Sequence, residues 1–224
     1  MKIKYFGHSC FTIENNNLKI LLDPFITQNP LIKMDVMSIE ADVILVTHDH
    51  EDHLGDAIEI SKKTGAPVIT IFDIAQELNK FGVSTIGGNL GGTIEYKGVN
   101  FTFVKAEHSS TNGVPVGFII TFEDNTVYFA GDTNVFSDMQ IIKELYNPNI
   151  VMLPIDGRFN MGPKEAAYAV KLLLPKIIIP MHYGTWDILT GTPDVLVKEL
   201  KKIDCSILNN PVVLVFDVLE VKEI

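Results

Sequence analysis

The chain of 224 residues has little cysteine, few basic residues and no long apolar run. Its two cysteines, Cys10 and Cys205, form no C-x-x-C pair, which argues against a thiolate metal site, and we expect both to be reduced and packed. No stretch of eighteen apolar residues occurs, so no membrane-spanning helix is predicted. The first residues lack the apolar core and cleavage site of a signal peptide, and we therefore expect a cytoplasmic protein without a membrane partner.

Basic residues are outnumbered by acidic ones, 18 against 28, and the net charge is −10 with histidine counted neutral. This balance argues against extended nucleic-acid binding, which requires faces rich in lysine and arginine. The hydrophobic share of 46% is ordinary for a globular protein. Because no linker or low-complexity segment interrupts the sequence, we predict a single domain over residues 1–224 rather than two separable ones.

Short apolar runs separated by turn residues predict many short strands and fewer helices. The predicted strands cover 3–6, 10–14, 18–22, 43–46, 67–71, 93–96, 99–106, 117–123, 126–130, 150–154, 177–180 and 211–221. The predicted helices cover 54–63, 73–81 (with Asp73 as N-cap), 137–145, 163–174 and a segment that begins at Pro193; Gly87-Gly88 and Gly91-Gly92 are predicted turns. A block of strands leads into mixed strands and helices twice, so we expect an α+β fold in which two sheets pack face to face with helices outside.

The strongest chemical signal is the hexad HDHEDH at residues 48–53, which directly follows a predicted buried strand. His48 and His50 lie two residues apart on an extended segment, so their side chains point the same way and can hold one ion. The chain then turns, and Asp52 and His53 can face a second ion. Half of the six histidines of the chain lie in this hexad, and the H-x-H-x-D-H spacing predicts a metal site.

Three further candidates follow later predicted strands: His108, Asp132 and His182. Taken alone, each has a structural explanation as a turn residue, a helix cap or a packed histidine. Their shared position at strand ends favours a common site, because loops that carry function converge there.

These motifs identify a family by resemblance. The segment Thr47 to Asp56, together with His108, Gly131-Asp132-Thr133 and Met181-His182-Tyr183, resembles the metallo-β-lactamase superfamily. Five flanking segments, 7–11, 22–25, 107–110, 136–139 and 160–163, resemble a branch of short metal-dependent hydrolases related to the ascorbate-6-phosphate lactonases. The resemblance covers nearly the whole chain and implies a four-layer αββα sandwich with a site for two metal ions.

The resemblance also implies a ligand set, carried over position by position. His48, His50 and His108 would hold the first ion, Asp52, His53 and His182 would hold the second, and Asp132 would bridge the two. All seven positions are filled. At Asp156 the chain departs from the glycine that relatives often carry, which points to an altered pocket rim.

Five imidazoles and two carboxylates without sulfur favour zinc or manganese, allow iron, nickel or cobalt, and disfavour copper(I). Two such ions about 3.5–4 Å apart share one water or hydroxide, and zinc lowers the pKa of bound water to about 7. Such a nucleophile attacks an ester, lactone, amide or phosphoester. We expect Asp52 to orient it while binding metal, and Asp23 either to support a ligand histidine or to form a turn before Pro24.

His8 lies outside the ligand set and at the end of the first strand, so we predict that it orients the substrate or donates a proton, with a purely structural histidine as the alternative. The leading hypothesis is a metal-dependent hydrolase that acts on a small-molecule ester, lactone or related bond. The alternatives are a phosphodiesterase or nuclease on the same scaffold and a non-catalytic protein that binds metal or a metabolite. We expect a small-molecule substrate and no nucleic acid; a homo-oligomer is a prior expectation.

Overall fold

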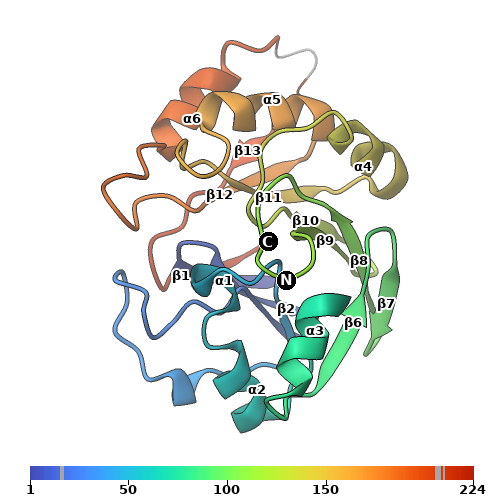
Figure 1. The fold of residues 1–224 in the computed structure, drawn as a ribbon. Coiled ribbons are helices and arrows are strands. Elements are labelled where there is room, and N and C mark those ends of the chain that lie inside the picture. Colours follow the sequence, from blue (N-terminus) through green and yellow to red (C-terminus); the bar gives the residue numbers. More distant parts are fainter. Residues whose placement is uncertain (16–17, 205–207, 209) are drawn as a thin grey trace. The chain divides into compact units, whose positions relative to one another are not determined.

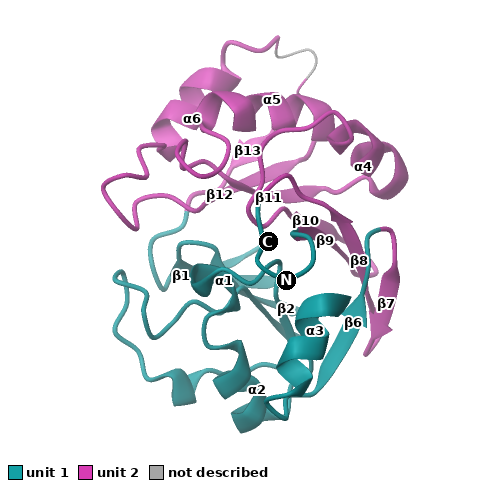
Figure 2. Cartoon of the chain, in the orientation of Figure 1, with its two compact units in different colours: residues 1–90, 109–115, 216–224 teal, residues 91–108, 116–215 magenta. Residues whose placement is uncertain are grey.

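The computed structural model describes residues 1–15, 18–204, 208 and 210–224. The chain folds into two compact units, coloured separately in Figure 2. The first comprises residues 1–90, 109–115 and 216–224, and the second comprises residues 91–108 and 116–215. Among the described residues, each unit contains one seven-stranded sheet and its helices. The single domain expected over residues 1–224 stays a prediction.

The first unit is built on a mixed sheet, of which β1, β2 and β6 are labelled in Figure 1. In spatial order they are β14 (Val221–Glu223), β1 (Lys2–Gly7), β2 (Cys10–Asn15), β3 (Leu18–Leu22), β4 (Val43–Leu45), β5 (Val68–Ile71) and β6 (Thr85–Gly88). The strands from β14 to β3 pair antiparallel, and those from β3 to β6 pair parallel. Parallel strands are covered on both faces, which explains why every residue of β4 and β5 is buried. The first five predicted strands are confirmed within two residues.

The helices of this unit follow the strands of its parallel half: η1 (Val36–Ser38), α1 (Glu51–Leu54), α2 (Ala57–Thr64) and α3 (Phe72–Asn79). The helix predicted over 54–63 is confirmed as α2, but its predicted start at Leu54 is wrong, because Gly55 separates α1 from α2 with a φ of +41°. A Cβ at Gly55 would lie 2.4 Å from the carbonyl oxygen of Pro24, so the backbone approaches there more closely than any side chain allows. The N-cap predicted at Asp73 is also wrong, since Ile71 holds that position.

We expect the substitution Gly55→Ala to lower the free energy of unfolding by about 3–5 kcal/mol, because the added methyl group meets backbone and the φ is unfavourable. The matched control is Gly65→Ala, which also has a positive φ (+76°) but open space where the methyl group would lie. Its cost is expected to be about 1–2 kcal/mol, from the left-handed conformation alone. Urea unfolding of the two variants checks the difference, and equal losses would show that Pro24 does not crowd this position.

The second unit is built on the other mixed sheet. In spatial order its strands are β13 (Val212–Val213), β12 (Ile177–Met181), β11 (Ile150–Pro154), β10 (Thr126–Phe129), β9 (Val116–Thr121), β8 (Val99–Lys105) and β7 (Thr93–Tyr96). The strands from β7 to β10 pair antiparallel, and those from β10 to β13 pair parallel. The helices α4 (Met139–Tyr146), α5 (Pro163–Leu173) and α6 (Pro193–Leu200) follow in chain order, and the helix starts predicted at both prolines are confirmed.

Two other expectations about the strands are wrong. The long strand predicted over 211–221 is two short strands, β13 and β14, which belong to different sheets. Gly87 and Gly88, predicted as a turn, lie in β6, where pairing with β5 supplies the backbone hydrogen bonds. In both cases the pairing partner, which is distant in sequence, decides the local structure.

Cys10, in β2, is a buried free cysteine, as predicted, and burial raises the pKa of its thiol well above the usual value. Cys205 lies outside the described residues. In the described part of the chain, none of the helices is long and apolar enough to cross a membrane.

Candidate metal centre

The hexad occupies the strand-to-helix turn after β4. Thr47 and His48 are buried just beyond the strand, and His50 precedes the first residue of α1. Asp52 and His53 therefore lie in the first helical turn, with His53 buried and Asp52 half-buried. The turn predicted after His50 is confirmed and separates the two pairs of candidate ligands, but α1 begins at Glu51, inside the hexad, rather than at Leu54 as predicted.

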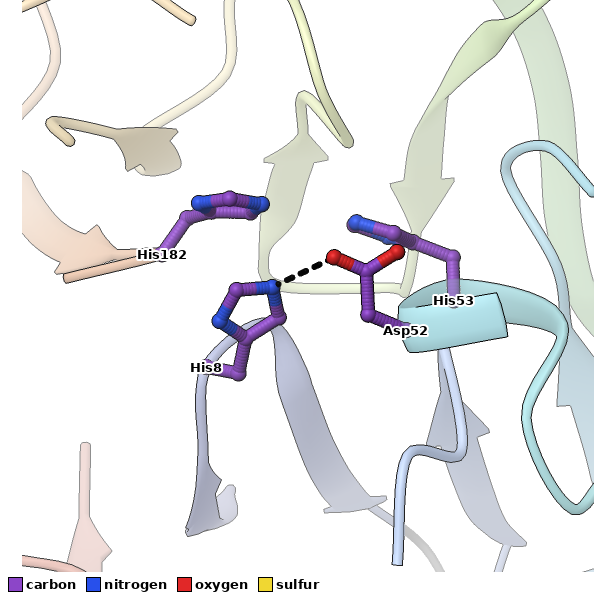
Figure 3. Close-up of side chains that lie close together, drawn as sticks. All are labelled: His8, Asp52, His53 and His182. Atoms are coloured by element: carbon purple, nitrogen blue, oxygen red, sulfur yellow. Dashed lines mark hydrogen bonds and ion pairs between the residues drawn. The ribbon is translucent and has the colours of Figure 1, made fainter. Parts of the chain in front are cut away.

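Within the first unit, the candidate ligand atoms lie close together. His48 Nε2 is 2.9 Å from His50 Nδ1, a spacing that allows both imidazoles to face one position. His8 Nε2 is 3.1 Å from Asp52 Oδ2, the contact drawn as a dashed line in Figure 3. His8, Asp52 and His53 each offer a ligand atom, all within 4.8 Å of one another. His8, placed by the sequence outside the ligand set, is therefore a neighbour of the second pair.

A buried carboxylate orients the histidines of the hexad. Asp23, which follows β3, accepts from His53 Nδ1 at 2.6 Å and from the Thr47 hydroxyl and amide at 2.7 and 2.9 Å. The Thr47 hydroxyl also lies 3.0 Å from His48 Nδ1. Both histidines thus have Nδ1 engaged by an oxygen, which leaves Nε2 as the ligand atom. The geometry favours the supporting role predicted for Asp23 over a mere turn before Pro24.

The second unit carries the remaining candidates, at the ends of β8, β10 and β12. His182 Nε2 lies 3.1 Å from Asp132 Oδ2, and His108 Nε2 lies 3.5 Å from the same oxygen. Asp132 and His182 are buried, and His108 is mostly buried. The carboxylate of Asp132 is thus the common neighbour of two imidazoles, as a bridging ligand requires. The structure brings these three predicted residues together within their own unit.

Asp156 is a functional candidate that sequence reasoning missed. Its Oδ2 lies 3.3 Å from His182 Nδ1, while its Oδ1 accepts from the backbone amides of Arg158 and Phe159, each at 2.7 Å. Burial alone would raise the pKa of Asp156, but the hydrogen bond and charge of His182, together with these amides, lower it to about 2. The sequence suggested only a changed pocket rim here. A signal was present in the sequence, since Asp156 lies two residues after the predicted strand 150–154, as Asp132 and His182 lie two residues after theirs.

Three of the site residues have an unusual backbone conformation. His8, Asp23 and His182 adopt positive φ values of +59°, +39° and +57°, a region that residues other than glycine seldom occupy. Such conformations cost about 1–3 kcal/mol each and persist at functional sites when the surroundings demand them. Positive φ values also occur away from these residues, at Lys97, Asn147, Leu174, Asn210 and Leu219, so the strain accompanies the site without being confined to it.

The donor set fits divalent metal ions. In two candidate ligands, His48 and His53, a hydrogen bond between Nδ1 and an oxygen fixes the ring so that Nε2 is the ligand atom. In a third, His182, Nδ1 lies 3.3 Å from Asp156 Oδ2. Imidazole nitrogen and carboxylate oxygen suit zinc, manganese and related divalent ions.

Comparison with known proteins gives a consistent picture. The family model of the beta-lactamase superfamily domain matches residues 2–182. A UPF0173 metal-dependent hydrolase of Methanopyrus kandleri is 42% identical over 92% of this chain and 94% of its own length. One from Pyrobaculum islandicum is 46% identical over 87% and 89%. The solved structure of Igni18, a metallo hydrolase from Ignicoccus hospitalis, is 37% identical and superposes with a TM-score of 0.90 over 100% of this chain and 98% of that one. The expected α+β fold of the metallo-β-lactamase type is confirmed.

Proposed function

Since the chain belongs to the beta-lactamase superfamily and, within it, to the metal-dependent hydrolases, we propose that it uses two divalent ions to activate water against an ester, lactone or related bond of a small molecule. One observation supports this most strongly: His48 and His53 each have Nδ1 hydrogen-bonded to an oxygen, of Thr47 and Asp23 respectively, and Asp156 Oδ2 lies 3.3 Å from His182 Nδ1. Such support is typical of metal-ligating histidines.

The proposed ligand set divides the seven residues between two ions. His48, His50 and His108 bind the first ion, Asp52, His53 and His182 bind the second, and Asp132 bridges them. Two features support this division. His48 and His50 approach each other at 2.9 Å before α1 begins, and Asp132 lies beside both imidazoles of its own unit.

Zinc or manganese in this site would supply a nucleophile at neutral pH and polarise the substrate carbonyl; iron, nickel or cobalt also suits the ligands. The residues of the chain would orient the ligands and the attacking water. Asp52 combines a ligand role with a catalytic one, because its carboxylate can hold the attacking water by a hydrogen bond. Asp23 keeps the ring of His53 in one tautomer, and Asp156 lies beside Nδ1 of His182.

His8 is proposed as the second catalytic residue. Its buried ring lies beside Asp52 Oδ2, and the Tyr5 hydroxyl donates to its backbone carbonyl at 3.2 Å, which helps to hold the strained backbone. From that position His8 can fix the Asp52 carboxylate and carry a proton toward a leaving group. The cytoplasmic location and a homo-oligomeric state stay predictions.

Removal and return of metal tests the proposal. Dialysis against a chelator is expected to abolish hydrolysis of a panel of esters and lactones, and addition of Zn²⁺ or Mn²⁺ is expected to restore it, because the proposed nucleophile is a water that only the bound ions activate. Elemental analysis should give two ions per chain.

The same panel separates the alternatives. It includes bis-p-nitrophenyl phosphate, RNA and single-stranded DNA, and preference for these would favour a phosphodiesterase or nuclease. Metal-free protein that hydrolyses esters as fast as the loaded protein contradicts the proposal. Two bound ions without turnover of any compound would favour a metal- or metabolite-binding protein.

A further inference from the structure

The segment 109–115 belongs to the first unit although the strands on either side of it belong to the second. β8 and β9 both lie in the second sheet, and between them the chain enters the first unit at Ser109 and leaves it after Pro115. Figure 2 shows the segment in the colour of the first unit. We call residues 109–115 the strap. Its first residue follows the candidate ligand His108 directly.

The strap is held by one carboxylate of the hexad. Asp49 Oδ1 accepts from the Ser110 hydroxyl at 2.8 Å and from the Thr111 amide at 2.7 Å. Asp49 Oδ2 accepts from the backbone amide and side-chain amide of Asn112, at 2.9 and 2.8 Å. All four partners are donors, so only an acceptor-only side chain satisfies them. Asp49 stands between His48 and His50, the two proposed ligands of the first ion.

A second attachment holds the far end of the strap. Gly113 has a φ of +64°, and a Cβ there would lie 3.0 Å from Ile71 Cγ2 and 3.1 Å from Asp73 Oδ2. The strap therefore packs against the residues that join β5 to α3, as well as against the hexad after β4. Ordering seven residues costs conformational entropy, and these contacts offset that cost.

We propose that Asp49 is a positioning residue that anchors the strap and thereby delivers His108 to the site of His48 and His50. The strap and His108 are linked by the covalent backbone. Ser110 is hydrogen-bonded to Asp49, and the Cα atoms of His108 and Ser110 are at most about 7 Å apart, because two residues of extended chain span no more. Anchoring the strap thus confines His108 to the neighbourhood of the first ion. This inference rests on the proposed function, since it takes His108 as a metal ligand.

The side chain needed at position 49 is specific. An asparagine in the same pose keeps one acceptor oxygen but turns its amide group toward two donors, either those of Asn112 or those of Ser110 and Thr111. Two hydrogen bonds are then lost, and two N–H or O–H donors of the strap face the NH₂ donor of the asparagine. Asp49→Asn is therefore expected to release the strap even though the side chain keeps its size.

The experiment compares Asp49→Asn with Asp35→Asn. Asp35 is a matched control, because it also accepts a backbone amide in the first unit, that of Met37 at 2.9 Å, but caps η1. A third protein, Ser110→Ala with Asn112→Ala, weakens the anchor from the other side without touching the hexad. Amide hydrogen exchange of the metal-free proteins reports the strap, and zinc competition against a chromophoric chelator reports the site.

In Asp49→Asn we expect the Thr111 and Asn112 amides to lose protection and zinc affinity to fall about 10–100-fold, as when other supporting partners of metal ligands are removed. The double variant should move both readouts in the same direction, and Asp35→Asn should move neither. If Asp49→Asn frees the strap but keeps the zinc affinity of the wild type, Asp49 has no positioning role. If the Thr111 and Asn112 amides keep their protection in Asp49→Asn, Asp49 does not anchor the strap.

If the wild-type protein itself binds no zinc, the proposed function is contradicted, and with it the role given to His108. Hydrogen exchange of the metal-free proteins would still test whether Asp49 anchors the strap.

Discussion

Replacing Asp132 with alanine is expected to lower kcat/KM by about 10³-fold, equivalent to about 4 kcal/mol of transition-state stabilisation. The carboxylate of Asp132 lies beside both His108 and His182, at 3.5 and 3.1 Å. In the proposed centre it is the only ligand shared by the two ions. Without it the ions lose their common ligand and their fixed separation, and elemental analysis should give fewer than two ions per chain.

The matched control is Asp138→Ala, which removes an exposed carboxylate of the same unit next to α4. Its ion pair with Lys105 is long, at 3.9 Å, so the substitution should change stability and kcat/KM little. Circular dichroism of both variants checks that the fold persists. An Asp132→Ala enzyme with two ions and near wild-type kcat/KM would remove the bridging role, and with it the proposed division of the ligands.

The substitution Asp23→Asn is expected to weaken metal binding about 10–100-fold while the fold persists. Asp23 Oδ2 accepts from His53 Nδ1, so the proton of the neutral ring lies on Nδ1 and Nε2 is the ligand atom. An asparagine that keeps its oxygen toward the Thr47 amide turns an NH₂ toward His53. The ring then has to accept at Nδ1, its proton moves to Nε2, and a protonated Nε2 cannot bind metal.

The fold should tolerate this change. Burial raises the pKa of Asp23 despite the opposing effects of His53 and Thr47, so burial disfavours the ionised carboxylate in the metal-free protein. A neutral amide removes that cost and offsets the altered hydrogen bond. The melting temperature of metal-free Asp23→Asn is therefore expected to stay near the wild-type value.

Two measurements distinguish a change in the tautomer of His53 from a change in packing around Asp23. Nitrogen-15 NMR of the metal-free protein should show the proton of His53 on Nδ1 in the wild type and on Nε2 in the variant. Zinc competition should show the loss of affinity. Asp42→Asn serves as control, because the Asp42 side chain also accepts a hydrogen bond from a backbone amide beside the same sheet, that of Lys19 at 2.9 Å. Asp42 lies before β4, whereas the hexad lies after β4. Unchanged zinc affinity in Asp23→Asn would mean that Asp23 does not set the tautomer of a ligand.

Local patterns predicted the strands well and failed where a distant segment decides the structure. β3, β7 and β11 lie at the predicted residues, because short apolar runs between turn residues carry their own boundaries. The break at Gly55 depends on Pro24, thirty-one residues earlier in the chain, and no pattern around residues 54–63 contains it. Gly87 and Gly88 of β6 were predicted as a turn because glycine disfavours strands, yet pairing with β5 overrides that preference.

In the candidate site, too, features set by local sequence were predicted and contacts with distant segments were missed. The hexad was found because spacing within six residues carries its chemistry, and Asp23 was found because it ends a strand. Asp156 was missed as the partner of His182, since their contact depends on the register of β11 against β12, which pairs Pro154 with Met181. Asp49 was seen only as part of the hexad, because the strap that it binds lies some sixty residues away.

The first sheet is completed late in synthesis. β14, which pairs with β1, follows every strand of the second sheet along the chain. A ribosome therefore makes all of the second sheet while β1 still lacks its outer neighbour. An unpaired strand edge invites association with other chains. During translation, β1 is thus an edge open to association with other chains until β14 emerges to cover it.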